Sequence, residues 1–422
     1  MKMQENGHAF IKAFRSSRFT TPSKKSIMLE LNKKIFSILF FSILTAVIGV
    51  GIVTPLLPVY AHDIGASGIY IGLIFGVFSL SRTLFVPYFG RLSDRKGRKP
   101  FIIAGLISYS IVSVGFLFSK NIGALITIRF IQGIASALIM PVCQAYIGDI
   151  TPKGKEGFAM GMFNTSMFLG LSIGPIIGGF VKDYYNLNAA FLCMGFLSFT
   201  AFLICLFYLP PTASENIKNY GKTPAKWRSL IFEKNIAALY LFQFTYTTSI
   251  GIIWAFLPIL ADTEFFLPSF YTGLLVSLGV FISGIMHTPM GIVADKFNKR
   301  ILVPAGGVIV TFAMLYFGRS TGFNNCLFAS ILFGIGGGIS IPALMALAVI
   351  KGKDTGGMGS VISLITAAHS LGMLTGSLAA GLIADMLQLR HAFYFGACIM
   401  ILGIILFLFL SNNKSKVHHK NL

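Results

Sequence analysis

Twelve long apolar segments constrain the fold of this chain more than any other feature. We place them approximately at residues 36–60, 68–89, 101–119, 122–147, 159–181, 189–209, 236–260, 270–290, 301–318, 325–350, 358–383 and 391–411. A helix needs about 20 apolar residues to cross the hydrocarbon core of a bilayer. Only helices and closed barrels satisfy every backbone polar group in lipid, and the sequence lacks the short alternating strands of a barrel. The chain is therefore predicted to be an all-α integral membrane protein with twelve transmembrane helices.

The composition excludes several other classes of protein. Of the 422 residues 55% are hydrophobic and only 11% are charged, whereas soluble domains carry about 25% charged residues. A soluble multidomain enzyme, a disordered chain and a fibrous repeat are thereby excluded. The five cysteines lie in or beside apolar segments without a CxxC pair, which argues against zinc or a disulfide framework. No nucleophile–base pair or nucleotide loop is visible, so we expect no enzymatic activity, no metal and no cofactor.

The basic residues are distributed unevenly between the two sides of the membrane. Twelve spans place both termini on one side, and of the 34 Lys and Arg residues only four fall in loops on the other side, namely Lys120, Lys182, Arg319 and Arg390. Because cytoplasmic loops collect Lys and Arg, we expect both termini in the cytoplasm. The net charge of +20 is explained in this way without a nucleic-acid partner. The basic tail is either an anchor for the first helix or an organelle transit peptide.

The chain reads as a duplicated unit of six helices. The repeat predicts a cytoplasmic tail (1–35), a six-helix bundle (36–209), a polar cytoplasmic linker (210–235), a second bundle (236–411) and a second cytoplasmic tail (412–422). Matching residues recur at an offset of about 200 positions: Pro58 and Pro258, Asp94 and Asp295, Pro141 and Pro342, Gly174 and Gly376, Gly179 and Gly381, Asp183 and Asp385. Two halves related by a pseudo-two-fold axis are a transporter architecture, with the substrate site between the halves near the bilayer midplane.

Four motifs link the chain to a known family. The segment from Gly90 to Lys99 (GRLSDRKGRK) reads as a tight, basic turn, and Gly291 to Arg300 (GIVADKFNKR) is its weaker second copy. This loop resembles the signature of the major facilitator superfamily. The segments RFIQG from Arg129, GLSIGPIIGG from Gly170 and GVGIVTPLLP from Gly49 are similar to helix motifs of its twelve-helix drug:proton antiporter branch. The resemblance covers nearly the whole chain and implies the major facilitator fold.

The resemblance also implies a set of residues that control conformation. They are Gly90, Asp94, Arg95, Gly97, Arg98, Asp149 and Asp295 around the two signature loops, and Gly170, Gly174, Pro175 and Gly178 in the fifth span. The resemblance suggests that Asp149 pairs with Arg98 in the signature loop and thereby locks the outward-open state. The alternative is that Asp149 is a solvated acid at the end of its helix. The glycines and the proline form either a hinge that seals against leak or a surface for close helix packing.

Polar residues inside the spans are the candidates for the substrate and proton pathway. We take Arg82, Arg129 and His369 as the ionisable groups of the membrane interior, apart from tyrosines and cysteines, because a charge there is costly. The other candidates are Gln132 and Ser136, which share a helical stripe with Arg129, and Gln243, Tyr246 and Trp254 in the seventh span. The resemblance assigns Arg129 to proton coupling. For both arginines, a structural ion pair or hydrogen bond remains the alternative. For His369 the alternative is a neutral imidazole hydrogen-bonded to a neighbour, and for the seventh-span residues it is a structural role at the membrane interface.

The positions of the acids restrict the expected substrate. All 14 Asp and Glu residues fall at span ends or in loops, so we expect neutral or anionic solutes rather than cations. The sequence as a whole predicts a monomeric, multi-pass transporter of a bacterial inner (cell) membrane, in contact with lipid. Its predicted function is proton-coupled efflux, by alternating access, of drug-like compounds or metabolites such as siderophores. Uptake of a nutrient by symport or facilitation, and a non-transporting receptor or scaffold, remain the alternatives.

Overall fold

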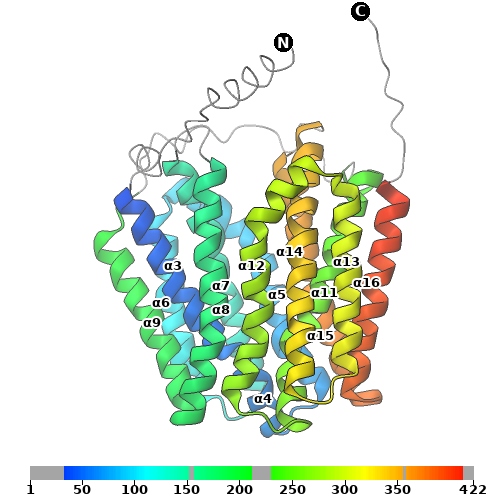
Figure 1. Ribbon diagram of the computed structural model, residues 1–422. Helices are drawn as coiled ribbons and strands as arrows, with labels where there is room; N and C mark the ends of the chain where they lie inside the picture. Colours follow the sequence, from blue (N-terminus) through cyan, green and yellow to red (C-terminus); the bar gives the residue numbers. More distant parts are fainter. Residues whose placement is uncertain (1–32, 152–155, 212–229, 355–357, 412–422) are drawn as a thin grey trace, which may run out of the picture.

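The computed structural model describes residues 33–151, 156–211, 230–354 and 358–411. Within these ranges it is built from helices (Figure 1): α3 (Lys33–Val53), α4 (Leu56–Asp63), α5 (Gly68–Lys96), α6 (Lys99–Phe118), α7 (Ile122–Ile150), α8 (Glu156–Tyr184), α9 (Leu187–Tyr208), α11 (Lys234–Thr263), α12 (Ser269–Lys296), α13 (Lys299–Gly318), α14 (Phe323–Asp354), α15 (Met358–Met386) and α16 (Leu389–Ser411). They provide 12 spans long and apolar enough to cross a membrane, the first composed of α3 and α4. The predicted fold class is confirmed.

Helix α3 begins and helix α16 ends at the same end of the bundle, the upper end in Figure 1. We call this the terminal end and the opposite one the distal end. Helices α8 and α12 therefore lie with Tyr184 and Ser269 at the distal end, and α5 and α15 with Gly68 and Met386 there. These four helices form the boundary between the halves.

The same helix pairs recur in both halves. In the first half, α3 packs against α8 and α9, α7 against α5 and α6, and α6 against α9. In the second half, α11 packs against α15 and α16, α14 against α12 and α13, and α13 against α16. The boundary repeats as well, since α5 packs against α15 and α8 against α12. This correspondence is the pseudo-two-fold symmetry that the sequence offset predicts.

The two signature segments are more helical than expected. We expected a tight turn from Gly90 onward, but α5 continues to Lys96, and in the second copy α12 continues to Lys296. Polar residues extend a helix into water without losing backbone hydrogen bonds, so the end of the apolar run did not mark the end of the helix. The reversal of the chain direction falls at Gly97, whose φ of +87° lies in the region that favours glycine.

The first span is interrupted between α3 and α4. Pro55 has no backbone N–H to continue the ladder, and the Val50 carbonyl accepts hydrogen bonds from both the backbone N–H and the hydroxyl of Thr54, at 3.1 and 2.8 Å. The break divides the segment that resembles the antiporter motif of the first span.

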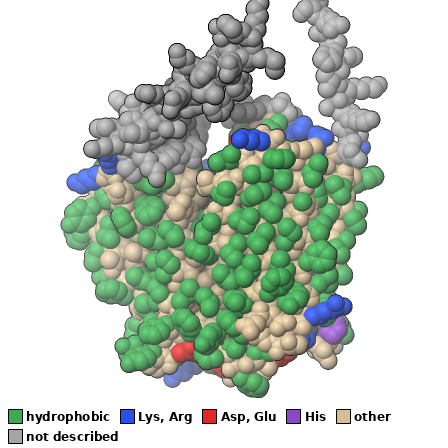
Figure 2. Space-filling view, in the orientation of Figure 1, with side chains coloured by type: hydrophobic (Ala, Val, Ile, Leu, Met, Phe, Trp, Pro, Cys, Tyr) green, Lys and Arg blue, Asp and Glu red, His purple; other side chains and the backbone are tan. Residues whose placement is uncertain are grey.

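The outer surface of the bundle is apolar between its ends. Figure 2 shows hydrophobic side chains over the middle of the visible face, with basic and acidic side chains near the two ends. Large side chains such as Phe118, Phe196 and Phe409 are more than two-thirds exposed, at 75%, 71% and 79%. An apolar belt between charged ends is the surface that a bilayer requires.

Candidate central cavity and inter-half contacts

A cavity of about 350 Å³ lies between the two halves. Many of its lining residues sit near the middle of their helices, for example Met140 in α7, Ile250 in α11 and Val280 in α12. The lining is mostly aliphatic and aromatic, which is usual for sites that bind small organic molecules. A wider hollow of about 630 Å³ is formed at the distal surface by the ends of several helices. Residues of both halves line both spaces, but the central cavity is the better candidate for a binding site because it is the more enclosed and the more apolar of the two.

Five of the eight residues predicted for the substrate and proton pathway line this cavity. They are Arg82, Ser136, Tyr246, Trp254 and His369. The remaining three, Arg129, Gln132 and Gln243, are buried behind the lining, with exposed fractions of 4%, 0% and 3%. The predicted residues of both halves therefore lie around one cavity. Some of them line it, and the others are buried behind the lining.

His369 and Gln243 form a polar pair on the second-half side of the cavity. The Gln243 amide Nε2 lies 3.3 Å from Nδ1 of His369. With the amide donating, Nδ1 accepts and the neutral imidazole carries its proton on Nε2. The Gln243 Oε1 atom is buried without a hydrogen-bond partner among the described residues. Gln243 thus orients the ring of the histidine that lines the cavity.

Arg129 is held by groups of the first half. Its Nε donates to the Ile74 carbonyl of α5 at 3.2 Å, and its Nη1 donates to Oε1 of Gln132 at 2.7 Å. Its guanidinium also lies over the rings of Phe75 and Phe78, 5.0 and 4.6 Å from their centroids. The stripe that Arg129 shares with Gln132 and Ser136 therefore contacts α5 at its Arg129 end and reaches the cavity at Ser136.

Several cavity residues were not singled out from the sequence. Tyr109 and Ser136 of the first half line the cavity, and so do Tyr246 and Ser283 of the second half, so that each half contributes one tyrosine and one serine. Periodicity gave no signal for Tyr109, because α6 is apolar on all sides and a lone tyrosine there resembles a core residue.

His287 of α12 is a further ionisable residue that we did not count in the membrane interior. Its Nδ1 lies 2.6 Å from the Ser283 carbonyl. Its ring contacts the ring of Phe168 from α8, with centroids 4.8 Å apart. This contact crosses the boundary between the halves beside the cavity.

Glycines bring the distal parts of the two halves into backbone contact. A Cβ atom on Gly72 of α5 would collide with the Ser377 carbonyl of α15. On the other boundary, a Cβ on Gly179 of α8 would collide with the Ser269 carbonyl of α12. At these two contacts the halves leave no space for a side chain, and the contacts separate the central cavity from the distal surface.

Two carboxylates reinforce the distal contact, one in each half. Asp183 at the end of α8 accepts hydrogen bonds from the backbone N–H groups of Ser269 and Phe270, at 3.0 and 2.7 Å. Asp385 at the end of α15 accepts from those of Gly68 and Ile69, at 2.6 and 2.8 Å. Each carboxylate thus caps the first N–H groups of a helix that belongs to the other half, where the helix dipole also favours a negative charge.

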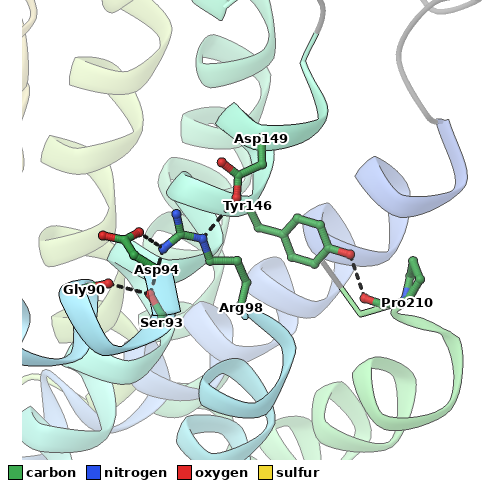
Figure 3. Close-up of polar contacts among 7 residues, drawn as sticks. All are labelled: Gly90, Ser93, Asp94, Arg98, Tyr146, Asp149 and Pro210. Atoms are coloured by element: carbon green, nitrogen blue, oxygen red, sulfur yellow. Dashed lines mark hydrogen bonds and ion pairs between the residues drawn. The ribbon is translucent and has the colours of Figure 1, made fainter. Parts of the chain in front are cut away.

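The terminal end holds a different polar cluster, shown in Figure 3. Arg98 donates from Nε to Asp149 at 3.1 Å and from Nη1 to the Ser93 hydroxyl at 2.8 Å, and it forms an ion pair with Asp94 at 2.5 Å. Burial alone would lower the pKa of Arg98, but the hydrogen bond and charge of Asp149, together with Asp94, raise it above its ordinary value. The predicted contact of Asp149 with Arg98 is present, and all members of the cluster belong to the first half.

The other predicted gating residues fall into two groups. Gly170, Gly174 and Gly178 face α3, where a Cβ would collide with backbone or side-chain atoms of residues 47–52, and Pro175 lies inside α8. These residues allow close packing within the first half. In contrast, Arg95 and Asp295 are exposed at the terminal end, and a Cβ on Gly90 would meet nothing within 4 Å. The same holds for Gly161 and Gly291, so the boundary helices have room at their terminal ends.

The described residues contain no group of three or more His, Cys, Asp or Glu side chains that could hold a metal ion. Cys143, Cys193, Cys205, Cys326 and Cys398 are free thiols.

Comparisons of the sequence with known proteins agree on one family. The sequence model of the Major Facilitator Superfamily matches residues 39–357 and 239–421. An uncharacterised transporter of that type from Methanocaldococcus jannaschii is 30% identical over 90% of this chain and 98% of its own length. The multi-drug resistance efflux pump PmrA of Streptococcus pneumoniae is 30% identical over 82% of this chain and 88% of its length. Among solved structures, a bacterial homologue of the human lysosomal transporter Spinster, inward-facing and unoccupied, superimposes with a TM-score of 0.76 at 13% identity, covering 89% of this chain and 96% of that one.

Proposed function

The chain belongs to the Major Facilitator Superfamily, and on this premise we propose that it exports small organic molecules by alternating access, driven by a proton gradient. That it is a multi-pass membrane transporter, and not an enzyme, follows from the family itself. The observation that carries the proposal is the central cavity, enclosed by both halves and closed at the distal end. The similarity to a multidrug efflux pump supports export as the direction.

The proposal includes an orientation in the membrane. The excess of Lys and Arg in loops of the terminal end favours a cytoplasmic location for that end, in the inner membrane of a bacterium. The structure then corresponds to the state that loads substrate from the cytoplasm, because the distal contacts close the outer side. Rocking of the two halves would break these contacts and expose the cavity to the outside.

The proposed substrates are neutral or anionic molecules, and we propose that the protein works as a monomer. Among the described residues that line the cavity there is no Asp or Glu, whereas Arg82 carries a positive charge. A cation 4 Å from this arginine would be repelled by about 4 kcal/mol at an effective dielectric constant of 20. Protons are the proposed coupling ion, with His369 and Arg129 as the groups to test, since histidine changes its charge near physiological pH.

The test is a transport assay with purified protein in proteoliposomes. A panel of neutral, anionic and cationic aromatic compounds is loaded, and their movement is followed under an imposed pH gradient, with and without a protonophore. We expect transport that the protonophore abolishes in the wild type and that is lost in Arg129→Ala and His369→Ala. Arg319→Ala and His391→Ala, both exposed residues at the distal end, serve as matched controls.

Two results would contradict the proposal. Movement of no compound under either a pH gradient or a membrane potential would argue against transport. Higher cellular accumulation of the compounds on expression of the protein would argue for uptake instead of export.

A further inference from the structure

The two arginines of the first half differ in what they contact. Arg129 has a carbonyl, an amide and two aromatic rings around its guanidinium. Arg82 lines the central cavity, and its guanidinium has no hydrogen bond or ion pair with any residue that the structure describes. A guanidinium has five N–H donors in a planar fork and stays charged at any physiological pH. The fork of Arg82 is therefore available to a molecule in the cavity.

The surroundings of Arg82 supply no compensating negative charge. The polar groups that share the cavity with it are the hydroxyls of Tyr109, Ser136, Tyr246, Ser283 and Ser330, the indole N–H of Trp254 and the imidazole of His369. Tyr109 and His369 are close enough to Arg82 to interact with it electrostatically. All of these groups are neutral or, for His369, cationic when protonated. A charge inside the membrane is costly unless it is paired. An anion bound in the cavity would pair with the guanidinium of Arg82 and neutralise its charge.

The remainder of the lining is suited to an apolar body. Phe78 and Phe168 from the first half, and Trp254, Phe333 and Met373 from the second, surround the space beside Arg82. The volume of about 350 Å³ is at the lower end of the range for sites that bind small organic ligands. The combination of one cationic fork with aromatic and thioether side chains matches a molecule that has a single acidic group and an aromatic or aliphatic body.

We propose that the central cavity is a binding site for amphipathic organic monocarboxylates, in which the guanidinium of Arg82 holds the carboxylate and the aromatic side chains of both halves hold the body. A carboxylate fits the guanidinium fork through two parallel hydrogen bonds. His369, on the opposite half, contributes a further donor from Nε2 while Gln243 occupies Nδ1. This inference rests on the proposed export function for its physiological meaning, but the binding site can be tested without transport.

The test uses three probes with the same body. They are 9-anthracenecarboxylate, its neutral carboxamide and the cationic (9-anthracenylmethyl)trimethylammonium ion. Trp254 lines the cavity, and the only other tryptophan of the chain is Trp227. Quenching of Trp254 fluorescence in a Trp227→Phe background therefore measures binding in purified, detergent-solubilised protein. The variants are Arg82→Gln, Arg82→Lys and, as a control outside the cavity, Arg319→Gln.

We expect the carboxylate to bind about tenfold or more tightly than the carboxamide, and the cation to bind least. Arg82→Gln should remove the preference for the carboxylate and change the affinity for the carboxamide by less than about twofold. Arg82→Lys should retain part of the preference, because lysine keeps the charge but lacks the fork. Arg319→Gln should behave like the parent protein.

Two results would overturn the inference: equal binding of the carboxylate and the carboxamide by the parent protein, or an unchanged carboxylate preference in Arg82→Gln. If Arg82→Gln fails to fold, as judged by gel filtration, the Arg82→Lys variant still decides, since a purely structural arginine would lower the affinity for all three probes equally. The two proposals fail in different ways. Carboxylate binding without movement under any gradient would contradict export alone, and movement of the carboxylate probe unaffected by Arg82→Gln would contradict the carboxylate site alone.

Discussion

Both ends of the bundle use aspartates, but the partners of these aspartates differ. At the terminal end, Asp94 and Asp149 contact Arg98, and all three belong to the first half. At the distal end, Asp183 and Asp385 each cap a helix of the other half. The terminal cluster can therefore persist while the halves move, whereas the distal caps must break when the distal end opens. The terminal cluster therefore stabilises the structure of the first half, whereas the distal caps stabilise one arrangement of the two halves relative to each other.

The two sets also differ in symmetry. Asp183 and Asp385 are separated by the repeat offset and make the same kind of contact in both halves. The described residues of the second half show no counterpart of the terminal cluster: Asp295 is exposed, and Ile350 occupies the position that corresponds to Asp149. The distal closure is thus a property of the duplicated fold, and the terminal cluster is specific to the first half.

The largest expected effect concerns the terminal cluster. Arg98→Ala removes the ion pair between Arg98 and Asp149, whose side chain is only 10% exposed. Removing one member of a buried pair costs about 3–5 kcal/mol, so we expect a clear loss of thermal stability in detergent. Arg95→Ala, which removes an exposed arginine nearby, is the matched control and should change stability little.

A second substitution tests the cause of this loss. Adding Asp149→Asn to Arg98→Ala also removes the carboxylate charge that Arg98 stabilises in the parent protein, and should restore part of the stability. Because the cluster lies within one half, neither variant should change the accessibility of the distal interface. Equal stability of Arg98→Ala and Arg95→Ala would show that the cluster is not a structural element.

The second expected effect concerns the close approach of the halves. In Gly179→Ala the new Cβ collides with the Ser269 carbonyl, and overpacking of this kind costs about 1–3 kcal/mol. The collision is relieved when the distal end opens, so the equilibrium should shift towards that state. Gly161→Ala in the same helix, where the Cβ would meet nothing within 4 Å, is the control.

The measurement uses a cysteine at the other distal boundary. Ser377 is fully buried against α5, so a Ser377→Cys reporter, in a background without the exposed Cys398, should react slowly with a membrane-impermeant maleimide. Gly179→Ala should accelerate the reaction and Gly161→Ala should not. The same labelling rate in both would mean that the two boundaries do not open together.

The sequence predicts the spans and the duplication well because both depend on local properties. Apolar runs of sufficient length must span the membrane, and repeated glycines and prolines recur where the same helices pack. The ends of α5 and α12 were placed several residues too early, since the helices continue through polar residues in water. Such extensions depend on backbone hydrogen bonding and not on hydrophobicity.

The candidate site was predictable only in part. Helical spacing showed that Arg129, Gln132 and Ser136 share a stripe, but it could not show that the stripe contacts α5 at one end and the cavity at the other. Asp183 and Asp385 were recognised as a repeated pair, whereas their partners lie in the opposite halves, which no local pattern encodes. Contacts across the pseudo-two-fold axis need the three-dimensional arrangement.

The smallest expected effect concerns the distal caps themselves. Replacing a capping side chain costs about 0.5–2 kcal/mol, and the asparagine in Asp183→Asn or Asp385→Asn still accepts one hydrogen bond while losing the charge that the helix dipole favours. Each variant should therefore accelerate labelling of the Ser377→Cys reporter by less than about tenfold. The caps lie on separate boundaries, so their free energies should add in the double variant. Asp63→Asn, at an exposed distal acid, should leave the rate unchanged. If the double variant labels no faster than Asp63→Asn, the backbone contacts alone close the distal end. The carboxylates of Asp183 and Asp385 would then not stabilise the closed state.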